Sequence, residues 1–134
     1  MTETTIAPVA AVRQLLQEVV AAWAANDADA FADLYTEDAA VILPGGVYHR
    51  DREQIRGFMR AAFDGPFKGS KSVDTQESVR LIGDDVAVVV SLSGIRLAGE
   101  EEVPAERMRR ASWVLARKAD GWLVESYHNC ALNA

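Results

Sequence analysis

Four side chains that can take part in chemistry stand in a row near the end of the chain: Tyr127, His128, Asn129 and Cys130. Tyrosine and asparagine donate and accept hydrogen bonds, histidine exchanges a proton near neutral pH, and a cysteine thiolate is a nucleophile. The surrounding segment GWLVESYHNCA has the composition of a β-strand, in which neighbouring side chains point to opposite faces. We therefore predict two pairs rather than one catalytic cluster, with Tyr127 and Asn129 on one face and His128 and Cys130 on the other.

The surroundings of these residues disfavour a hydrolytic or redox site. No acid at a recognisable spacing orients His128, no serine stands in a nucleophile elbow, and Cys130 has no cationic neighbour to stabilise a thiolate. The two histidines and one cysteine, at 49, 128 and 130, lack metal-ligand spacing, and no glycine-rich phosphate loop joins a strand to a helix. The sequence therefore predicts neither a metal nor an organic cofactor.

The chain of 134 residues fits one domain, 1–134, with flexible ends expected at 1–6 and 132–134. Its net charge of −6 and the lack of a basic cluster disfavour nucleic acid as a partner, because nucleic-acid affinity depends on lysine and arginine. No run reaches the ~18 apolar residues that a membrane span needs. With a single cysteine, which can form no internal disulfide, these features predict a cytoplasmic protein that binds neither nucleic acid nor membrane.

Three helices are predicted in the first half of the chain. Apolar residues recur at helical spacing through 4–26, where an asparagine provides the stop. A short second helix within 27–38 begins with a capping aspartate and carries Tyr35 on its apolar face. A third helix over 51–63 opens with Asp51 three residues before a glutamine, as in a capping box.

Strands dominate the rest of the chain. A short apolar strand, AAVIL, stops at the Pro-Gly-Gly of 44–46, and four strands with period-two patterns follow from residue 71. Short turns at 83–85 and 119–121 indicate antiparallel pairing of successive strands. Helices followed by an antiparallel sheet give an α+β fold in which the helices cover one sheet face. The apolar character of the strands predicts a homodimer through the other face.

The order of these elements, with WAANDADAFADLYTEDAAVILPGG early and ADGWLVESYHNCA late, resembles the nuclear-transport-factor-2-like superfamily. That superfamily includes SnoaL-like and ketosteroid-isomerase-like proteins, and the likeness spans residues 9–131. Within it the chain is most similar to the SgcJ-type proteins of bacterial enediyne antibiotic clusters. The resemblance implies a cone-shaped roll with a strongly curved, mostly antiparallel, cystatin-like sheet and an apolar pocket at its open end. Fold alone does not fix the chemistry, because members of this superfamily catalyse different reactions or none.

The residues of a ketosteroid isomerase are missing from two positions. A gapless match puts Leu43 at the place of that family's carboxylate base and Val19 at the place of the tyrosine that stabilises the enolate oxygen. The protonated acid that assists the tyrosine has no clear counterpart. The sequence therefore predicts the fold of an isomerase without its mechanism.

Strand alternation and the resemblance together select the pocket residues. One face of 86–95 is small and partly polar, and we predict that its serines point inward. Relatives direct the residue after the last histidine into the pocket, and here that residue is Asn129. The predicted ligand-binding residues are Trp23, Tyr35, Leu43, Phe63, Ser91, Ser93, Trp113, Tyr127 and Asn129.

The outward face of the last strand follows from the same alternation. His128 and Cys130 are expected there together with Trp122 and Val124. Glu125 stands on the opposite side of the strand, and the pattern leaves open whether it reaches the pocket or only its rim.

The sequence thus predicts a small-molecule pocket protein of bacterial polyketide or enediyne metabolism. Its ligand would be a large apolar intermediate, and any chemistry would be cyclisation or proton transfer. The alternative is a non-catalytic dimeric accessory or carrier protein that docks on a synthase. The missing isomerase residues favour this alternative.

Overall fold

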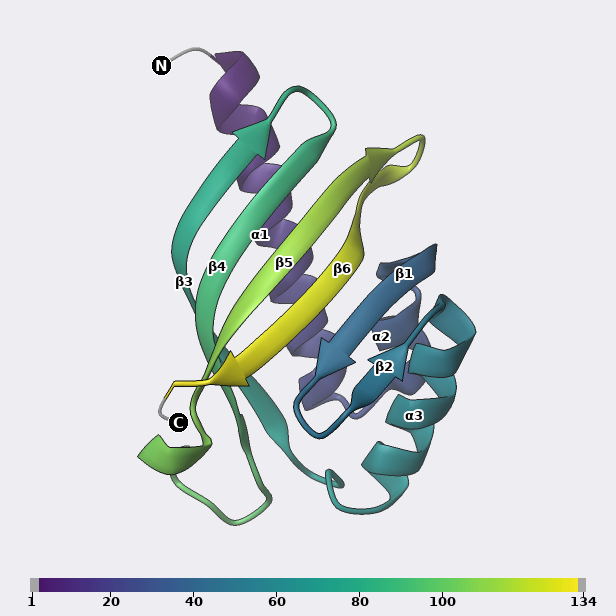
Figure 1. Ribbon diagram of the computed structural model, residues 1–134, viewed down its shortest axis with the longest axis vertical. Helices are drawn as coiled ribbons and strands as arrows, with labels where there is room; N and C mark the ends of the chain where they lie inside the picture. Colours follow the sequence, from purple (N-terminus) through teal and green to yellow (C-terminus); the bar gives the residue numbers. More distant parts are fainter. Residues whose placement is uncertain (1–2, 133–134) are drawn as a thin grey trace.

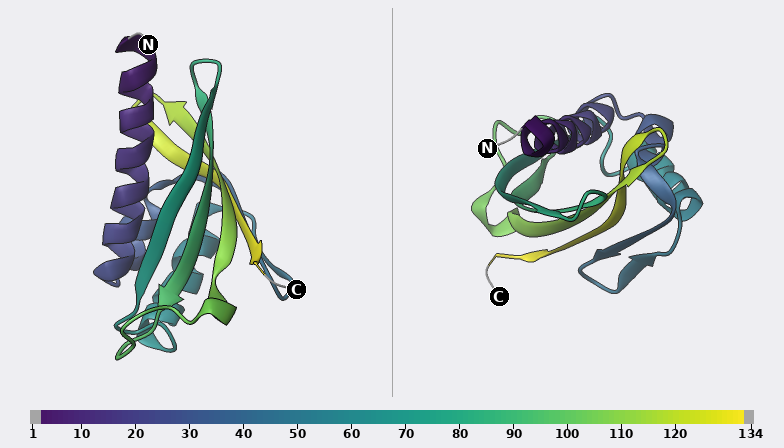
Figure 2. Two further views of the ribbon diagram at one scale, coloured as in Figure 1. Left: turned by 90° about the vertical axis from the view of Figure 1, so that its left-hand side faces the viewer. Right: turned by 90° about the horizontal axis from the view of Figure 1, so that it is seen from above.

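Helices and one six-stranded sheet form two layers in the computed structural model, which describes residues 3–132. The sheet curls around the long first helix, which lies along its concave face (Figures 1 and 2). The strand order is β2-β1-β6-β5-β4-β3, and all neighbours are antiparallel except β1 and β6. The predicted α+β class is confirmed. The elements are α1 (Glu3–Ala24), α2 (Ala28–Ala32), β1 (Tyr35–Leu43), β2 (Val47–His49), α3 (Arg52–Asp64), β3 (Lys71–Ile82), β4 (Val86–Arg96), the 3-10 helix η1 (Ala105–Arg107), β5 (Arg109–Lys118) and β6 (Gly121–Ala131).

Two sequence expectations concern the chain as a whole. The flexible ends expected at 1–6 and 132–134 include residues 1, 2, 133 and 134, which lie outside the described residues. Within 3–132, none of the helices combines the length and the apolar character that crossing a membrane requires.

The predicted stop of the first helix is confirmed. Helix α1 ends at Ala24, and Asn26 adopts a left-handed backbone conformation with φ of 51°, which asparagine tolerates better than most residues. The Asn26 side chain accepts a hydrogen bond from the Gly69 amide at 2.6 Å and donates one to the Ser70 carbonyl at 3.2 Å. The end of α1 is therefore joined to the segment that enters β3.

The two predicted capping aspartates are also confirmed. Asp27 accepts a hydrogen bond from the Ala30 amide at 3.0 Å, and Asp51 accepts one from the Gln54 amide at 2.8 Å. The Gln54 side chain accepts from the Arg50 amide at 2.7 Å, one residue before the position expected for a capping box. Local chemistry at these two sites is enough to begin α2 and α3.

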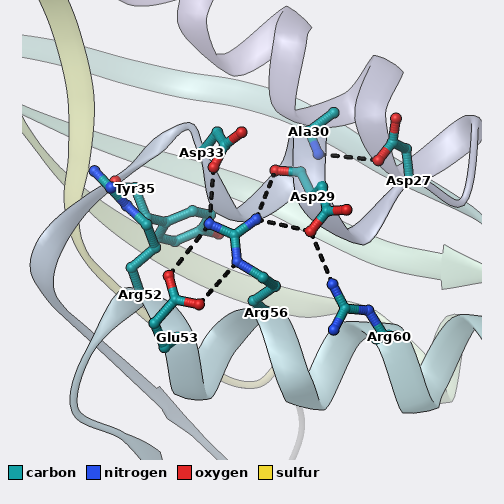
Figure 3. Close-up of polar contacts among 9 residues, drawn as sticks. All are labelled: Asp27, Asp29, Ala30, Asp33, Tyr35, Arg52, Glu53, Arg56 and Arg60. Carbon is teal, nitrogen blue, oxygen red and sulfur yellow. Dashed lines mark hydrogen bonds and ion pairs between the residues drawn. The ribbon is translucent and has the colours of Figure 1, made fainter.

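A single arginine joins α2 to α3. The Arg56 guanidinium donates to Asp29 at 2.9 Å, to Asp33 at 2.8 Å and to Glu53 on its own helix at 3.1 Å (Figure 3). Arg60 adds one bond to Asp29 at 2.9 Å, but 59% of its side chain is exposed against 16% for Arg56. Because α2 has only five residues and cannot be stable alone, this network fixes its position.

Tyr35 lies on β1 and not on a second helix, so that prediction is wrong. Helix α2 ends at Ala32, and the chain enters the strand at Tyr35, which pairs with Val124 of β6. The Val124 amide also donates to the Leu34 carbonyl at 2.8 Å. The sequence near Tyr35 does not reveal this strand, because its hydrogen-bond partners lie on β6, almost ninety residues away in the chain.

A further strand, β2, was not predicted. The Pro-Gly-Gly at 44–46 does end β1, but Gly45 and Gly46 have φ of 86° and 80° and turn the chain back on itself. Leu43 then pairs with Val47, and Val41 pairs with His49. The expected stop is therefore a hairpin turn that adds a sixth strand to the sheet.

The predicted outward position of Trp122 and Val124 is wrong. A β-bulge at Glu125 lets Ser126 pair with Val114 and Val124 pair with Leu115, so the alternation reverses at that point. Val124 is fully buried, and Trp122 packs against the core from the same side. Both side chains therefore face inward.

Replacing Arg56 with alanine is predicted to lower the free energy of unfolding by about 1–2 kcal/mol, because three acidic partners lose a largely buried cation. Urea denaturation of the purified variant measures this loss. Arg60→Ala is the matched control and should cost less than about 0.5 kcal/mol, since its one ion pair is exposed. Equal losses in the two variants would contradict the proposed junction between α2 and α3.

Candidate functional site

A cavity of about 410 Å³ lies between the concave face of the sheet, α1 and α3. Its walls are mostly apolar and include Val19 from α1, Met59 from α3 and Val41 from β1. The volume falls within the range of ~300–1,000 Å³ that is typical of ligand pockets. The cavity can therefore hold a small organic molecule.

Two neighbouring rungs of the sheet place polar side chains on this concave face. In the first rung, Asp74 on β3 lies opposite Ser93 on β4, which lies opposite Arg109 on β5, and all three line the cavity. Such a polar band is unusual on a face that is otherwise apolar, because buried polar groups need partners. The second rung consists of Gln76, Ser91, Ala111 and Asn129.

A hydrogen-bond relay connects the two rungs. The Trp113 indole donates to the Ser91 hydroxyl at 3.1 Å, and that hydroxyl donates to Oδ2 of Asp74 at 2.7 Å. An indole N–H can only donate, so the Ser91 oxygen must accept from it and its own proton is directed to the carboxyl group. Oδ2 is thereby fixed as an acceptor. A proton bound by Asp74 therefore resides on Oδ1.

The environment of Asp74 favours its neutral form. Burial raises the pKa of the Asp74 carboxyl above its ordinary value, and the hydrogen bond that Ser91 donates only partly offsets this increase. A carboxyl group with a raised pKa exchanges its proton nearer to neutral pH than an exposed aspartate does. This is the property that general acid–base catalysis requires.

Two tyrosines complete the polar part of the cavity. Burial raises the pKa of Tyr127, and it raises the pKa of the fully buried Tyr35 still further, so both hydroxyls stay protonated at neutral pH. The Asn129 amide donates to the Tyr127 oxygen at 2.8 Å, and the Tyr127 ring packs on Trp113 with centroids 4.3 Å apart. Tyr127 is thus held beside the relay with its own O–H proton free to donate.

Comparison with known proteins identifies the family. A model of the SnoaL-like domain matches residues 12–132, which is most of the chain. The protein belongs to the SnoaL-like family. No curated protein matches this SnoaL-like chain in sequence.

Solved structures agree with this fold. A cystatin-like domain of unknown function from Nostoc punctiforme aligns with a TM-score of 0.87 at 25% identity, covering 100% of this chain and 81% of that one. A nuclear-transport-factor-2-like protein from Novosphingobium aromaticivorans aligns with a TM-score of 0.81 at 20% identity, covering 97% and 85%. A ketosteroid isomerase-like protein from Erwinia carotovora aligns with a TM-score of 0.73 at 16% identity, covering 93% and 96%. These similarities confirm the cystatin-like, nuclear-transport-factor-2-like architecture.

The SnoaL-like cavity brings together seven of the nine residues predicted to bind a ligand. Phe63 is one exception, because it packs edge-on behind Trp23 with ring centroids 5.4 Å apart. Ser91 is the other, since it is fully buried beneath the cavity wall and acts through Asp74. The seven that line the cavity are Trp23, Tyr35, Leu43, Ser93, Trp113, Tyr127 and Asn129.

The orientation of the last strand follows the prediction beyond its bulge. His128 and Cys130 are exposed, whereas Tyr127 and Asn129 line the cavity. Glu125, whose position was left open, accepts a hydrogen bond from the Thr36 hydroxyl and does not line the cavity. The row YHNC is therefore divided between two faces.

Sequence reasoning missed Asp74 and His49, which both line the cavity. Asp74 stands in the run KSVDTQES, whose alternate polar residues resemble a solvated strand face. No pattern in the sequence identifies it, because counting back from the turn at 83–85 pairs Asp74 with Gly94, and only a bulge at Glu77 shifts its partner to Ser93. His49 lies on β2, where its ring packs on Phe58 with centroids 4.6 Å apart and burial lowers its pKa. Within 3–132, no three His, Cys, Asp or Glu side chains converge on a metal position.

Proposed function

We propose that this SnoaL-like protein binds a mostly apolar, ring-bearing molecule and moves a proton on it with Asp74. The observation that carries the proposal is a carboxyl group with a raised pKa in the wall of an apolar cavity, beside the protonated Tyr127. Perturbed carboxyl groups of this kind concentrate at functional sites.

The reaction class is proton transfer next to a carbonyl group. Ionised Asp74 removes a proton from the carbon beside the carbonyl, and the electron pair of the C–H bond moves to form an enolate. Tyr127 donates a hydrogen bond to the developing oxygen anion, as the stabilising group does in many enolising enzymes. The proton on Oδ1 of Asp74, or a solvent deuteron that has replaced it, then adds to the same carbon, which gives exchange, or to a conjugated carbon, which gives isomerisation. In a ring closure the enolate carbon instead bonds to a second carbonyl carbon of the same molecule, and the Asp74 proton neutralises the alkoxide oxygen that forms.

This chemistry uses different positions from those of the ketosteroid isomerases. Leu43 and Val19, which match that family's base and tyrosine, line the cavity as apolar side chains. Asp74 on β3 takes the role of the carboxylate base that is missing at Leu43 on β1, and Tyr127 on β6 takes the role of the hydrogen-bond donor that is missing at Val19 on α1. The absence of the isomerase residues therefore does not remove the capacity for proton transfer.

A bacterial polyketide or enediyne intermediate is the ligand that we favour. Its support is the resemblance of the sequence to SgcJ-type proteins and the aromatic walls formed by Trp23, Trp113 and Tyr127. The cavity volume of about 410 Å³ lies in the lower half of the usual range for ligand pockets, which favours a compact ligand over a large one.

The second candidate function is a non-catalytic carrier of the same intermediate. It is favoured by the apolar side chains of Leu43 and Val19 in place of the isomerase machinery. A carrier and an enzyme would bind the ligand in the same cavity, so only a measurement of catalytic turnover distinguishes the two functions.

Deuterium exchange into 6-hydroxy-2-tetralone, a bicyclic ketone with acidic C–H groups and a ring hydroxyl, tests the proposal. We expect the protein in D2O to accelerate exchange, followed by proton NMR, and Asp74→Asn to reduce the enzymatic rate roughly 100-fold or more. The rate should rise with pH through the raised pKa of Asp74, because only the ionised carboxyl is a base.

Asp84→Asn is the matched control, since it removes the same charge from an exposed turn and should leave the rate unchanged. Exchange at the buffer rate in the native protein, or an undiminished rate in Asp74→Asn, would exclude the proposed base. The first of these results would favour the carrier.

We further propose that the protein forms a homodimer through the outer face of the sheet. Alternate residues of β4 that point away from the core are apolar and only partly covered, among them Val88, Val90 and Leu92. Native mass spectrometry should give twice the subunit mass of 14.6 kDa, and Val90→Lys should shift the protein to monomer. A monomeric native protein would refute this assembly.

A further inference from the structure

Four residues that line the cavity contain a buried polar atom with no hydrogen-bond partner within the described part of the chain. The atoms are Nε2 of His49, Oγ of Ser72, Oδ1 of Asp74 and Oδ1 of Asn129. Buried polar groups are nearly always paired in folded proteins, so four exceptions around one cavity require an explanation. Water can pair such atoms in a cavity of this volume, and a ligand that displaces the water must supply the partners instead.

The hydrogen-bond polarity of two of these atoms can be assigned. The amide nitrogen of Asn129 already donates to Tyr127, so the atom left over is its carbonyl oxygen, which can only accept. Oδ2 of Asp74 accepts from Ser91, so the atom left over is Oδ1, which accepts when the carboxyl is ionised. Ser72 and His49 can donate or accept. The ligand must therefore provide at least one donor.

The charge of that donor is restricted by its surroundings. A ligand ammonium group would have to leave water for an apolar cavity whose wall also carries the Arg109 guanidinium. Both Arg109 and Asp74 act electrostatically on Tyr127, so positive and negative charge are already present around this position. A neutral hydroxyl donor meets the oxygen acceptors without adding a charge.

We propose that the cavity selects a ring-bearing alcohol, phenol or enol, whose hydroxyl group donates to the carbonyl oxygen of Asn129. Asn129 is then the residue that determines specificity, while Asp74 moves the proton. The proposal rests on the function proposed above, in the same cavity. A ligand that lacks the hydroxyl leaves the Asn129 oxygen buried and unpaired, and sites built for a hydroxyl discriminate strongly against such analogues.

Three aromatic probes of one ring system test this selection. 2-Naphthol carries the donor, 2-methoxynaphthalene has the donor blocked by a methyl group, and naphthalene lacks the oxygen. Isothermal titration calorimetry of the native protein should show that 2-naphthol binds at least about tenfold more tightly than both others. Because 2-methoxynaphthalene is more apolar, burial of apolar area alone predicts the opposite order for this pair. Naphthalene is smaller than both, so its weak binding excludes a steric cause.

A variant assigns the recognition to one residue. Asn129→Leu keeps the side-chain size but removes the acceptor, and the preference for 2-naphthol over 2-methoxynaphthalene should fall to within about threefold. His128→Leu is the matched control, because this neighbour is exposed on the opposite face of β6 and should keep the full preference. Retained binding of 2-methoxynaphthalene by Asn129→Leu shows that its cavity is intact.

The possible outcomes separate the two proposals. Equal affinities for the three probes, binding of none of them at their solubility limits, or an unchanged preference in Asn129→Leu would overturn the selection by Asn129. If Asn129→Leu does not fold, the probe comparison on the native protein still decides. A clear preference for 2-naphthol without deuterium exchange into 6-hydroxy-2-tetralone supports the selection by Asn129 and excludes the proton transfer. Exchange into this ketone without a preference among the three probes supports the proton transfer and excludes the selection.

Discussion

The relay from Trp113 through Ser91 to Asp74 keeps a carboxyl group in the wall of an apolar cavity. The concave face of the sheet has to serve as both the core and the cavity floor, and a polar side chain on such a face is costly unless it is hydrogen-bonded. The relay supplies one partner for Asp74 and fixes which of its oxygens remains free. The position of Tyr127 against Trp113 depends on the same indole, so the proposed acid and donor are held together.

Burial of Asp74 also has a consequence for stability. Its raised pKa means that the folded state favours the protonated carboxyl, and this stabilisation is present below the ordinary aspartate pKa and lost as the pH rises through the raised value. The ionised form of Asp74, which the proposed base requires, is therefore less favourable in the folded protein than it would be for an exposed aspartate. A group that is unfavourable to the fold and yet held by specific bonds is typical of functional sites.

Local chemistry in the sequence predicts part of this structure. The caps at Asp27 and Asp51 and the stop at Asn26 depend on neighbouring residues, and alternation along β4 correctly places Ser91 and Ser93 on the inner face. Features that depend on distant strands escaped prediction. Tyr35 lies on a strand and not on the expected helix because it pairs with β6. The bulge at Glu125 interrupts the strict alternation of inward and outward residues that the prediction assumed. Asp74 was missed because a second bulge, at Glu77, shifts the register of β3 against β4 and turns the Asp74 side chain inward.

The titration of Asp74 is the most direct test of this account. Carbon-13 NMR of the side-chain carboxyl groups, with the Asp74 signal assigned by its absence in Asp74→Asn, follows the protonation of this one residue from pH 3 to 8. Because Asp74 is buried, its midpoint should lie clearly above the ordinary aspartate value of about 3.9. A midpoint at or below that value would mean that the carboxyl is well solvated or paired with a cation, and it would contradict a role for Asp74 in proton transfer near neutral pH.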